Sequence, residues 1–293
     1  MTKLVDLSKI QYFTEKSSVE TVVARTGPKA DARLAEVWAS LVKHLHNFAK
    51  DIDLRQEEWD LAIEFLTATG HICDENRQEF VLLSDVIGFS MLTDAINNRR
   101  PSGATENTVL GPFHVADAPE YEMGTNISLD GKGESCRFEG RVVDTDGNAI
   151  QGARIDVWCD NADGFYDVQQ PDIQPKWNNR GVFTTGPDGS YHFRGSKPVS
   201  YPIPHDGPVG QLLIQLDRHP YRPAHMHYMV TAPGHEKIVT HTFVGEDEYL
   251  NSDAVFGVKA TLVAEFNENE DGDTQWRSPF DFVMVPVKAA EAG

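Results

Sequence analysis

The spacing of apolar residues changes once along this 293-residue chain, and this change constrains the fold more than any other feature. From the start to about residue 100, apolar residues recur every three or four positions, which is typical of one face of an α-helix. From about residue 135 they alternate in short runs separated by turn residues, which is typical of β-strands. We therefore expect an α+β protein, with an N-terminal helical domain over residues 1–100 and a mixed β-sandwich domain over residues 101–293.

Two of the expected helices differ in which faces they should bury. Residues 34–48 carry a single apolar stripe, so this helix should bury one face. A later helix, over about residues 75–97, has almost no polar face, so most of it should be buried. Asp85 lies within the apolar stripe of this later helix, where a carboxylate is costly unless a partner pairs with it. Either a nearby donor of the protein pairs with Asp85, or its carboxylate lines a binding pocket.

Short runs of period two are expected to form the strands of the sandwich. A strand–turn–strand unit is predicted by residues 136–143 and 154–159, around the turn sequence Asp144 to Asn148. Further strands are expected at Tyr191–Phe193, Leu212–Gln215, His225–Thr231, Lys237–Phe243 and Phe282–Val287.

Charge and cysteine content exclude several classes of partner. Lys and Arg number 26 against 45 Asp and Glu, so the formal net charge is −19. Such an acidic surface repels nucleic-acid phosphates and anionic lipid, and we expect neither nucleic acid nor a membrane as a partner. The three cysteines are odd in number and show no Cys-x-x-Cys spacing, which favours reduced thiols. Together with the lack of a charged-then-apolar leader, this predicts a cytoplasmic protein.

The sequence Arg222-Pro223-Ala224-His225-Met226-His227 indicates a possible metal site. A strand sends alternate side chains to opposite faces, so His225 and His227 share one face. Two such side chains are about 7 Å apart, and both can bind one metal ion. Alternatively, the two histidines face solvent or complete a polar face. The pattern alone leaves both interpretations open.

An apolar segment interrupts the linker between the helices and the strands. It comprises Val109, Leu110, Gly111, Pro112 and Phe113. Either this segment is a loop packed against the core, or it forms the wall of a pocket.

Several motifs fall in the order found in intradiol ring-cleavage dioxygenases, which the chain resembles over nearly its whole length. They are Asp156-Val157-Trp158, Asp206-Gly207-Pro208, Arg222-Pro223-Ala224-His225-x-His227 and Ala232-Pro233-Gly234-His235. The segments Leu82–Asp85 and Tyr249–Gly257 resemble the hydroxyquinol-cleaving branch of that family more than the catechol or chlorocatechol branches.

The resemblance implies one ferric ion per chain, with Tyr166, Tyr201, His225 and His227 as its ligands. Phenolate is a hard anionic ligand that suits ferric iron, as tyrosine does in some haem proteins. Tyr201 would leave the metal as substrate binds and accept a substrate proton. Arg222 would stabilise negative charge that develops on the ring, although an ordinary surface arginine is the alternative. His241 stands where many relatives carry glutamine, so its role is open between catalytic hydrogen bonding and packing.

The resemblance also implies a substrate, a pocket and a partner. The reaction would open hydroxyquinol with O2 to 3-hydroxy-cis,cis-muconate (maleylacetate), a step in the catabolism of aromatic compounds. The chain would form a homodimer through its N-terminal helices, with a phospholipid at the dimer interface. The implied substrate-binding residues are Leu82, Asp85, Val109, Leu110, Gly111, Pro112, Phe113, Ile203, Pro204, Arg222 and Val255.

Three alternatives compete with this interpretation. A catechol or chlorocatechol 1,2-dioxygenase would share the iron chemistry and differ in its pocket. Residues 140–153 also match a strand–turn–strand pattern of transthyretin-like binding modules, which carry out no chemistry. A cupin-like ferrous oxygenase fits less well, because no carboxylate lies close after His227 to complete a two-histidine-one-carboxylate site.

Overall fold

The computed structural model describes residues 10–75, 77–269 and 272–287. The chain divides into two compact units, residues 1–68 and residues 69–293, and each is described by itself. A domain boundary near residue 100 stays a prediction from the sequence. Among the described residues, no helix is long and apolar enough to cross a membrane.

The first unit consists of helices. They are α1 (Ser18–Val23), α2 (Ala32–Asp51) and most of α3 (Gln56–His71). Helix α2 begins at Asp31, whose side chain accepts a hydrogen bond from the backbone N–H of Leu34 at 2.8 Å, so one otherwise unpaired donor of the first turn is satisfied. The predicted apolar stripe of α2 is exposed in the single chain, with side chains between 46% and 63% accessible. The described residues of the first unit therefore leave this face uncovered.

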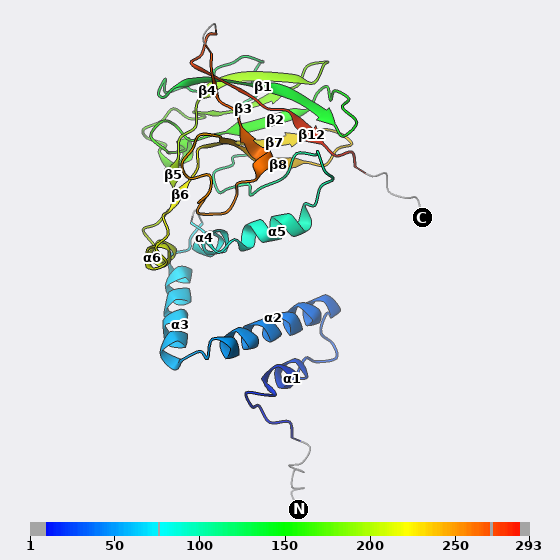
Figure 1. Ribbon diagram of the computed structural model, residues 1–293, viewed down its shortest axis with the longest axis vertical. Coiled ribbons are helices and arrows are strands. Elements are labelled where there is room, and N and C mark those ends of the chain that lie inside the picture. Colours follow the sequence, from blue (N-terminus) through cyan, green and yellow to red (C-terminus); the bar gives the residue numbers. More distant parts are fainter. Residues whose placement is uncertain (1–9, 76, 270–271, 288–293) are drawn as a thin grey trace, which may run out of the picture. The chain divides into compact units, whose positions relative to one another are not determined.

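Three helices belong to the second unit: α4 (Glu79–Val86), α5 (Phe89–Asn97) and α6 (Pro208–Gln215). The single buried helix predicted over residues 75–97 is wrong. Gly88 adopts a left-handed conformation, with φ of +75°, and divides it into α4 and α5. Apolar side chains on both helices, among them Val81 and Phe89, remain exposed in the single chain. Figure 1 shows α4, α5 and α6 together at one end of the strands of this unit.

Helix α6 replaces the strand that was predicted at Leu212–Gln215, so that prediction is also wrong. Pro208 opens this helix in its first turn, where its fixed φ is already suitable and its missing N–H is not needed. Val209 and Leu213, four residues apart, share the buried face of the helix. The helical period thus decides a segment whose short apolar run also fits a strand.

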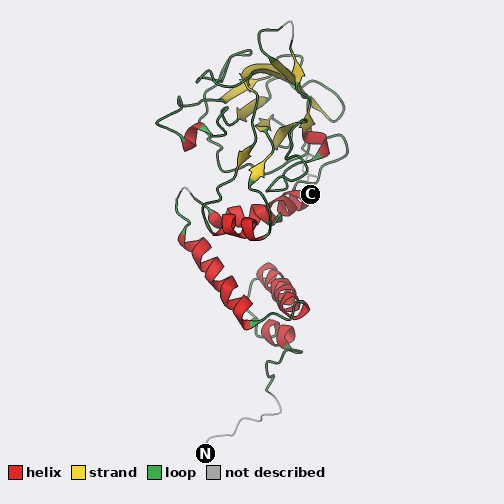
Figure 2. Cartoon of the chain, turned by 60° about the vertical axis from the view of Figure 1, so that its left-hand side comes forward, coloured by secondary structure: helices red, strands yellow, loops and turns green. Residues whose placement is uncertain are grey.

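The second unit is built on two five-stranded sheets. In the first, β1 (Ser135–Asp144) pairs antiparallel with β4 (Ser190–Ser196) and parallel with β11 (Trp276–Pro279) and β12 (Phe282–Met284), while β10 (Asn267–Glu268) adds to β11. The second has the order β3 (Arg180–Thr184), β2 (Arg154–Trp158), β7 (His225–Thr231), β8 (Ile238–Val244) and β9 (Val263–Ala264). Figure 2 shows these strands gathered together, with short helices beside them.

Shorter elements connect the sheets. They are a two-stranded ribbon of β5 (Tyr201–Pro202) and β6 (Tyr221–Arg222), and the 3-10 helices η2 (Asp167–Gln169) and η3 (Ala260–Leu262). The α+β class and the mixed sheets predicted from the sequence are confirmed. The core contains side chains of both sheets, including Phe138 and Phe193 from the first and Ile155 and Met226 from the second.

Strand β7 separates the core from the candidate site. Met226, Tyr228 and Val230 are buried in the hydrophobic core. Because side chains alternate along a strand, His225 and His227 point away from that core. His241 on the neighbouring strand β8 stands opposite His227 in the register of the two strands. The sheet therefore brings three histidines to one face.

Candidate metal centre and active site

Four candidate ligands meet beside the second sheet, and all are buried. His225 and His227 come from β7, Tyr201 comes from β5, and Tyr166 immediately precedes η2. The Nε2 atoms of His225 and His227 are 3.2 Å apart, and Nε2 of His227 is 3.0 Å from the Tyr166 hydroxyl. The two tyrosine hydroxyls are 3.3 Å apart. The side chains thus form a continuous chain of donor atoms.

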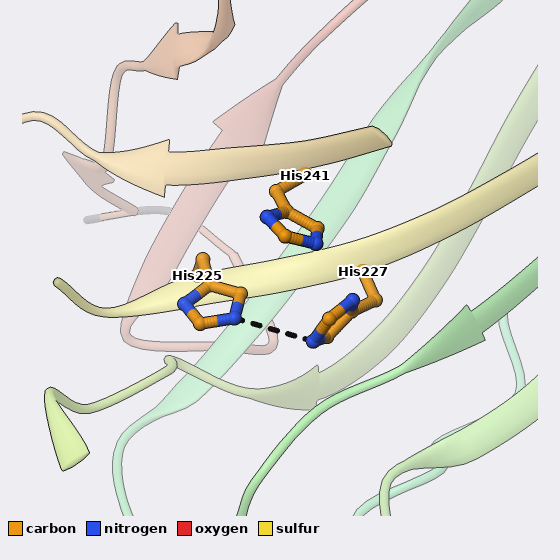
Figure 3. Close-up of side chains that lie close together, drawn as sticks. All are labelled: His225, His227 and His241. Atoms are coloured by element: carbon orange, nitrogen blue, oxygen red, sulfur yellow. Dashed lines mark hydrogen bonds between the residues drawn. The ribbon is translucent and has the colours of Figure 1, made fainter. Parts of the chain in front are cut away.

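The orientation of His225 is fixed by its own backbone. Its Nδ1 lies 2.7 Å from the carbonyl oxygen of Pro223. Because a carbonyl only accepts hydrogen bonds, Nδ1 carries the hydrogen and Nε2 carries the lone pair. That lone pair faces the other candidate ligands (Figure 3). This arrangement, in which one ring nitrogen is held so that the other can bind, is common among metal-binding histidines.

Trp158 holds the second histidine from the neighbouring strand. In the register of β2 and β7, Trp158 stands opposite His227. Their rings stack with centroids 4.7 Å apart and an interplanar angle of 14°. Phe113 stacks on the ring of Tyr166, with ring centroids 4.5 Å apart and an interplanar angle of 29°. Flat aromatic contacts therefore restrict the rings of both His227 and Tyr166.

Burial sets the protonation of the cluster. It lowers the pKa of His225 to about 3, with a further contribution from the charge of Arg222, and lowers the pKa values of His227 and His241 well below the usual range. Burial also raises the pKa values of Tyr166 and Tyr201. The imidazoles are therefore neutral at pH 7 and have lone pairs to offer a cation.

The donor set fits a ferric ion. Phenolate and imidazole are both established ligands of iron in proteins. The Nε2 atoms of His225 and His227 and the hydroxyls of Tyr166 and Tyr201 each lie 3.0 to 3.3 Å from the next candidate ligand atom, close enough for one ion to bind all four. His225, His227 and His241 also have ligand atoms within 4.8 Å of one another, so a set of three histidines is present beside the two tyrosines. Figure 3 shows how these three rings face each other.

Arg222 is buried beside this cluster and is not a surface residue. Its Nη1 lies 3.2 Å from Nε2 of His225. Its Nε and Nη2 atoms donate to the carboxylate of Asp253 at 3.2 Å and 3.5 Å. No sequence pattern singles out Asp253, although it lies within the segment Tyr249–Gly257 that carries part of the family resemblance.

The apolar segment at residues 109–113 lies against the histidines. Gly111 has a φ of +76°, and a Cβ atom there would come within 3.0 Å of Cε1 of His227. Together with the Phe113 stack, this brings the segment to the candidate ligands, as the pocket-wall interpretation requires. Leu110 and Pro112 are exposed, while Val109 is half-buried.

The remaining candidate pocket residues come from three other elements. Ile203 and Val255 are buried, and Leu82 is half-buried. Pro204 is exposed. Burial raises the pKa of Asp85, while a hydrogen bond with Ser90 and the charge of Arg222 act in the opposite direction. Asp85 thus has a donor within the protein and also lies in the electrostatic field of Arg222.

Comparison with known proteins identifies the class. A sequence model described as "Dioxygenase" matches residues 109–286, and one described as "Catechol dioxygenase N terminus" matches residues 31–105. The chain therefore belongs to the family of intradiol ring-cleavage dioxygenases and is an enzyme. This finding excludes both the transthyretin-like binding module and the cupin-like oxygenase.

Within this family, several relatives at 45–56% identity are named hydroxyquinol 1,2-dioxygenase, and one at 47% identity is named 6-chlorohydroxyquinol 1,2-dioxygenase. The hydroxyquinol 1,2-dioxygenase of Rhizobium sp. (strain MTP-10005) is 56% identical over 284 residues, which cover 94% of this chain and 96% of that protein. The crystal structure of hydroxyquinol 1,2-dioxygenase from Pseudomonas putida DLL-E4 matches with a TM-score of 0.89 and 43% identity, over 93% of this chain and 99% of that one. The catechol 1,2-dioxygenase of Acinetobacter radioresistens matches with a TM-score of 0.79 and 28% identity, over 94% of each chain.

Proposed function

We propose that this enzyme opens the ring of hydroxyquinol with O2, between two adjacent hydroxyl-bearing carbons, and forms 3-hydroxy-cis,cis-muconate (maleylacetate). The observation that carries this proposal is the buried cluster of two tyrosines and two histidines beside Arg222, in a chain 56% identical to a hydroxyquinol 1,2-dioxygenase. A catechol or chlorocatechol substrate is less well supported, because the catechol enzyme described above is only 28% identical.

The cofactor that fits this reaction is Fe(III), one per chain, which Tyr166, Tyr201, His225 and His227 would hold. The ferric ion, when bound, lowers the pKa of substrate hydroxyls and withdraws electron density from the ring. The protein supplies the remaining functions. The fixed Nδ1–H of His225 keeps its Nε2 lone pair directed into the site. His241, whose ring centroid is 4.1 Å from that of His227, restricts the movement of that ring.

Tyr201 and Arg222 move protons and stabilise charge. Burial raises the pKa of Tyr201 and the charge of Arg222 only partly opposes this, so the phenolate form would come from binding to the ferric ion, which lowers the pKa of a bound hydroxyl. A phenolate at Tyr201 accepts the proton of a substrate hydroxyl as the substrate enters. Arg222 then stabilises the negative charge that develops on the ring, because its cation is held in place before the reaction begins.

The third hydroxyl of hydroxyquinol gives Asp85 its role. The carboxylate of Asp85 lies in a partly buried position near the charges of Arg222 and Asp253. A substrate hydroxyl that donates to this carboxylate adds a hydrogen bond to the one from Ser90, and catechol, which lacks that hydroxyl, cannot form it. Sites of this kind reject the analogue that lacks the hydroxyl by up to about 10⁴-fold.

The exposed stripe of α2 provides the surface for a second copy of the chain. It consists of Leu34, Val37, Trp38, Leu41, Leu45 and Phe48. Contiguous exposed apolar surfaces are typical of protein interfaces or lipid sites. A homodimer through the N-terminal helices covers this stripe, and a phospholipid fills the apolar space that remains between the subunits. The location of the enzyme in the cytoplasm stays a prediction.

Metal analysis, spectra and turnover of the purified protein test this function. We expect about one iron per chain, a visible phenolate-to-iron band, and higher kcat/KM for hydroxyquinol than for catechol. Tyr166→Phe and Tyr201→Phe should each shift or bleach the band, because each removes a phenolate. Tyr191→Phe is the matched control, since Tyr191 is equally buried but donates to the carbonyl of Phe280 outside the site. Stoichiometric zinc in active enzyme would contradict the ligand set, and faster cleavage of catechol would contradict the substrate.

A further inference from the structure

The carboxylate of Asp253 accepts two hydrogen bonds from one edge of the Arg222 guanidinium. Its Oδ1 accepts from Nε at 3.2 Å and its Oδ2 accepts from Nη2 at 3.5 Å. Both side chains are buried, at 2% and 5% side-chain accessibility. The guanidinium is planar, so a carboxylate on the Nε and Nη2 edge fixes the direction of Nη1. Nη1 is the atom that lies 3.2 Å from Nε2 of His225.

Asp253 is itself held rigidly by the segment that follows it. The backbone N–H of Val255 donates to Oδ1 at 3.2 Å, and the backbone N–H of Gly257 donates to Oδ2 at 2.8 Å. The backbone N–H of Ala254 donates to the carbonyl oxygen of Tyr221, the residue immediately before Arg222, at 3.1 Å. Each carboxylate oxygen thus has one backbone donor and one guanidinium donor, and the segment is tied directly to β6.

Gly257 leaves the space that this arrangement needs. A Cβ atom at this position would lie 2.9 Å from Nη2 of Arg222 and 3.1 Å from Oδ2 of Asp253. Both distances are shorter than ordinary contacts, so any larger residue would displace the arginine or its partner. The φ of Gly257 is not in the left-handed region, so space and not backbone conformation is what the glycine provides.

We propose that Asp253 and Gly257 are positioning residues of the ring-cleavage reaction, which hold Arg222 so that Nη1 faces the iron ligands and the substrate. This inference rests on the proposed function. The pair is poor evidence for stability alone, because burying two charges costs about as much free energy as their attraction returns. A fixed cation, however, stabilises a developing charge without reorganisation. A displacement of about 1 Å in such a group can lower the rate by about 10²-fold.

Two independent substitutions test the positioning. Asp253→Asn removes the negative charge and places an amide N–H group where the carboxylate accepted hydrogen bonds. Gly257→Ala adds a methyl group close to Nη2 of Arg222. We expect each to lower kcat for hydroxyquinol by about 10- to 100-fold, with unchanged iron content, an unchanged visible band and little change in KM. Gly186→Ala is the matched control, because its Cβ would meet Asp188 at 3.4 Å in a turn outside the site, also without a left-handed φ. Near-normal kcat in both variants would overturn the proposal.

A double-mutant cycle distinguishes positioning of Arg222 from an independent effect of Asp253. If Asp253 acts through Arg222, Asp253→Asn lowers kcat in the wild type but has almost no further effect in Arg222→Ala. Equal losses in both backgrounds would overturn the proposal.

The thermal midpoint gives a readout that does not depend on turnover. Arg222→Ala leaves the Asp253 carboxylate buried without its cation, so the midpoint should fall. Adding Asp253→Asn removes that unpaired charge, so the midpoint should rise again. A double variant less stable than both single variants would overturn the coupling. If the wild-type enzyme does not cleave hydroxyquinol but cleaves another diol, the proposed substrate is wrong. The double-mutant cycle of Asp253 and Arg222, measured with that diol, then still tests whether Asp253 positions Arg222.

Discussion

Two side chains in this site, those of His225 and Arg222, are each held by one set of polar atoms while another polar atom faces the candidate ligands. His225 uses Nδ1 to donate to Pro223 and keeps Nε2 for the cluster. Arg222 uses Nε and Nη2 for Asp253 and keeps Nη1 for His225. In each case, hydrogen bonds to one part of the side chain fix its orientation, so the other part points into the site in a single direction. Such preorganisation lowers the reorganisation that the reaction would otherwise require.

Arg222→Ala should retain iron and visible colour and lose at least about 10²-fold in kcat. The reason is that the guanidinium acts on charge that develops in the reaction, and the metal ligands remain in place. Steady-state kinetics on hydroxyquinol, with iron measured in the same samples, check this. Arg141→Ala is the control, because Arg141 is exposed on β1 and donates to the carbonyl of Asp188. A normal kcat with a raised KM would reduce Arg222 to a substrate-binding residue.

Asp85→Ala should weaken the preference for hydroxyquinol over catechol without abolishing turnover. We expect kcat/KM to fall for hydroxyquinol and to stay unchanged or rise for catechol, because only hydroxyquinol has the third hydroxyl that we propose donates a hydrogen bond to Asp85. Ser90→Ala addresses the other interpretation, since Ser90 is the donor that the protein itself offers to Asp85. Equal losses on both substrates in Asp85→Ala would indicate a packing defect in α4 and not a role in specificity.

The sequence predicts some of these residues better than others, for geometric reasons. Alternation along one strand is a local property, so His225 and His227 follow from the pattern alone. Tyr166 and Tyr201 lie at the end of a loop and on a two-residue strand, whose paths depend on distant contacts, and only the family resemblance suggested them. Asp253 carries no local signal at all, because its partner lies 31 residues away.

At the scale of elements, the site depends on how loops pack against the second sheet. The segment 109–113 approaches His227 through Gly111 and Tyr166 through Phe113. A second connection involves Arg218, which donates to the carbonyl of Val86 at the end of α4 and to the carbonyl of Ala254. It therefore links the helix that carries Asp85 to the segment that carries Asp253.

Gly111→Ala should lower iron content and the thermal midpoint together. The new Cβ would lie 3.0 Å from Cε1 of His227, so the ring or the loop must move. Gly147→Ala is a close control, because Gly147 has a φ of +83° but no atom within 4 Å of the added Cβ. Both substitutions strain the backbone, by about 1 kcal/mol, and only Gly111→Ala disturbs a candidate ligand. Equal iron content in the two variants would show that the loop does not position His227.

The elements themselves were predicted where period two or period 3.6 extends over several residues. The strands at residues 136–143, 154–159 and 225–231 are confirmed. The two errors, at residues 75–97 and 212–215, both concern segments with continuous apolar runs, such as residues 80–83 and 212–214. In such runs the pattern does not distinguish a buried helix, a broken helix and a strand, and Gly88 and Pro208 decide the outcome.

At the scale of the whole molecule, the α2 stripe should control the oligomeric state. Leu41→Lys should convert a dimer to a monomer, because a charged side chain would be buried in the centre of the apolar surface. Asn47→Lys adds the same charge on an exposed position of α2 outside the stripe and should leave the dimer intact. Sedimentation velocity over a range of concentrations distinguishes the two. A dimeric Leu41→Lys variant would place the interface elsewhere.

Strand β1 has a consequence for how this chain is made. Its parallel partners β11 and β12 lie about 140 residues further along the chain. During synthesis, β1 can pair with β4 early but must wait for β11 and β12, and such long-range pairing slows folding. Until then one edge of β1 is open to pairing with other chains. Strands β11 and β12 thus complete the first sheet long after β1 has been synthesised, so a chain that stops before β11 would leave this edge of β1 without its partners.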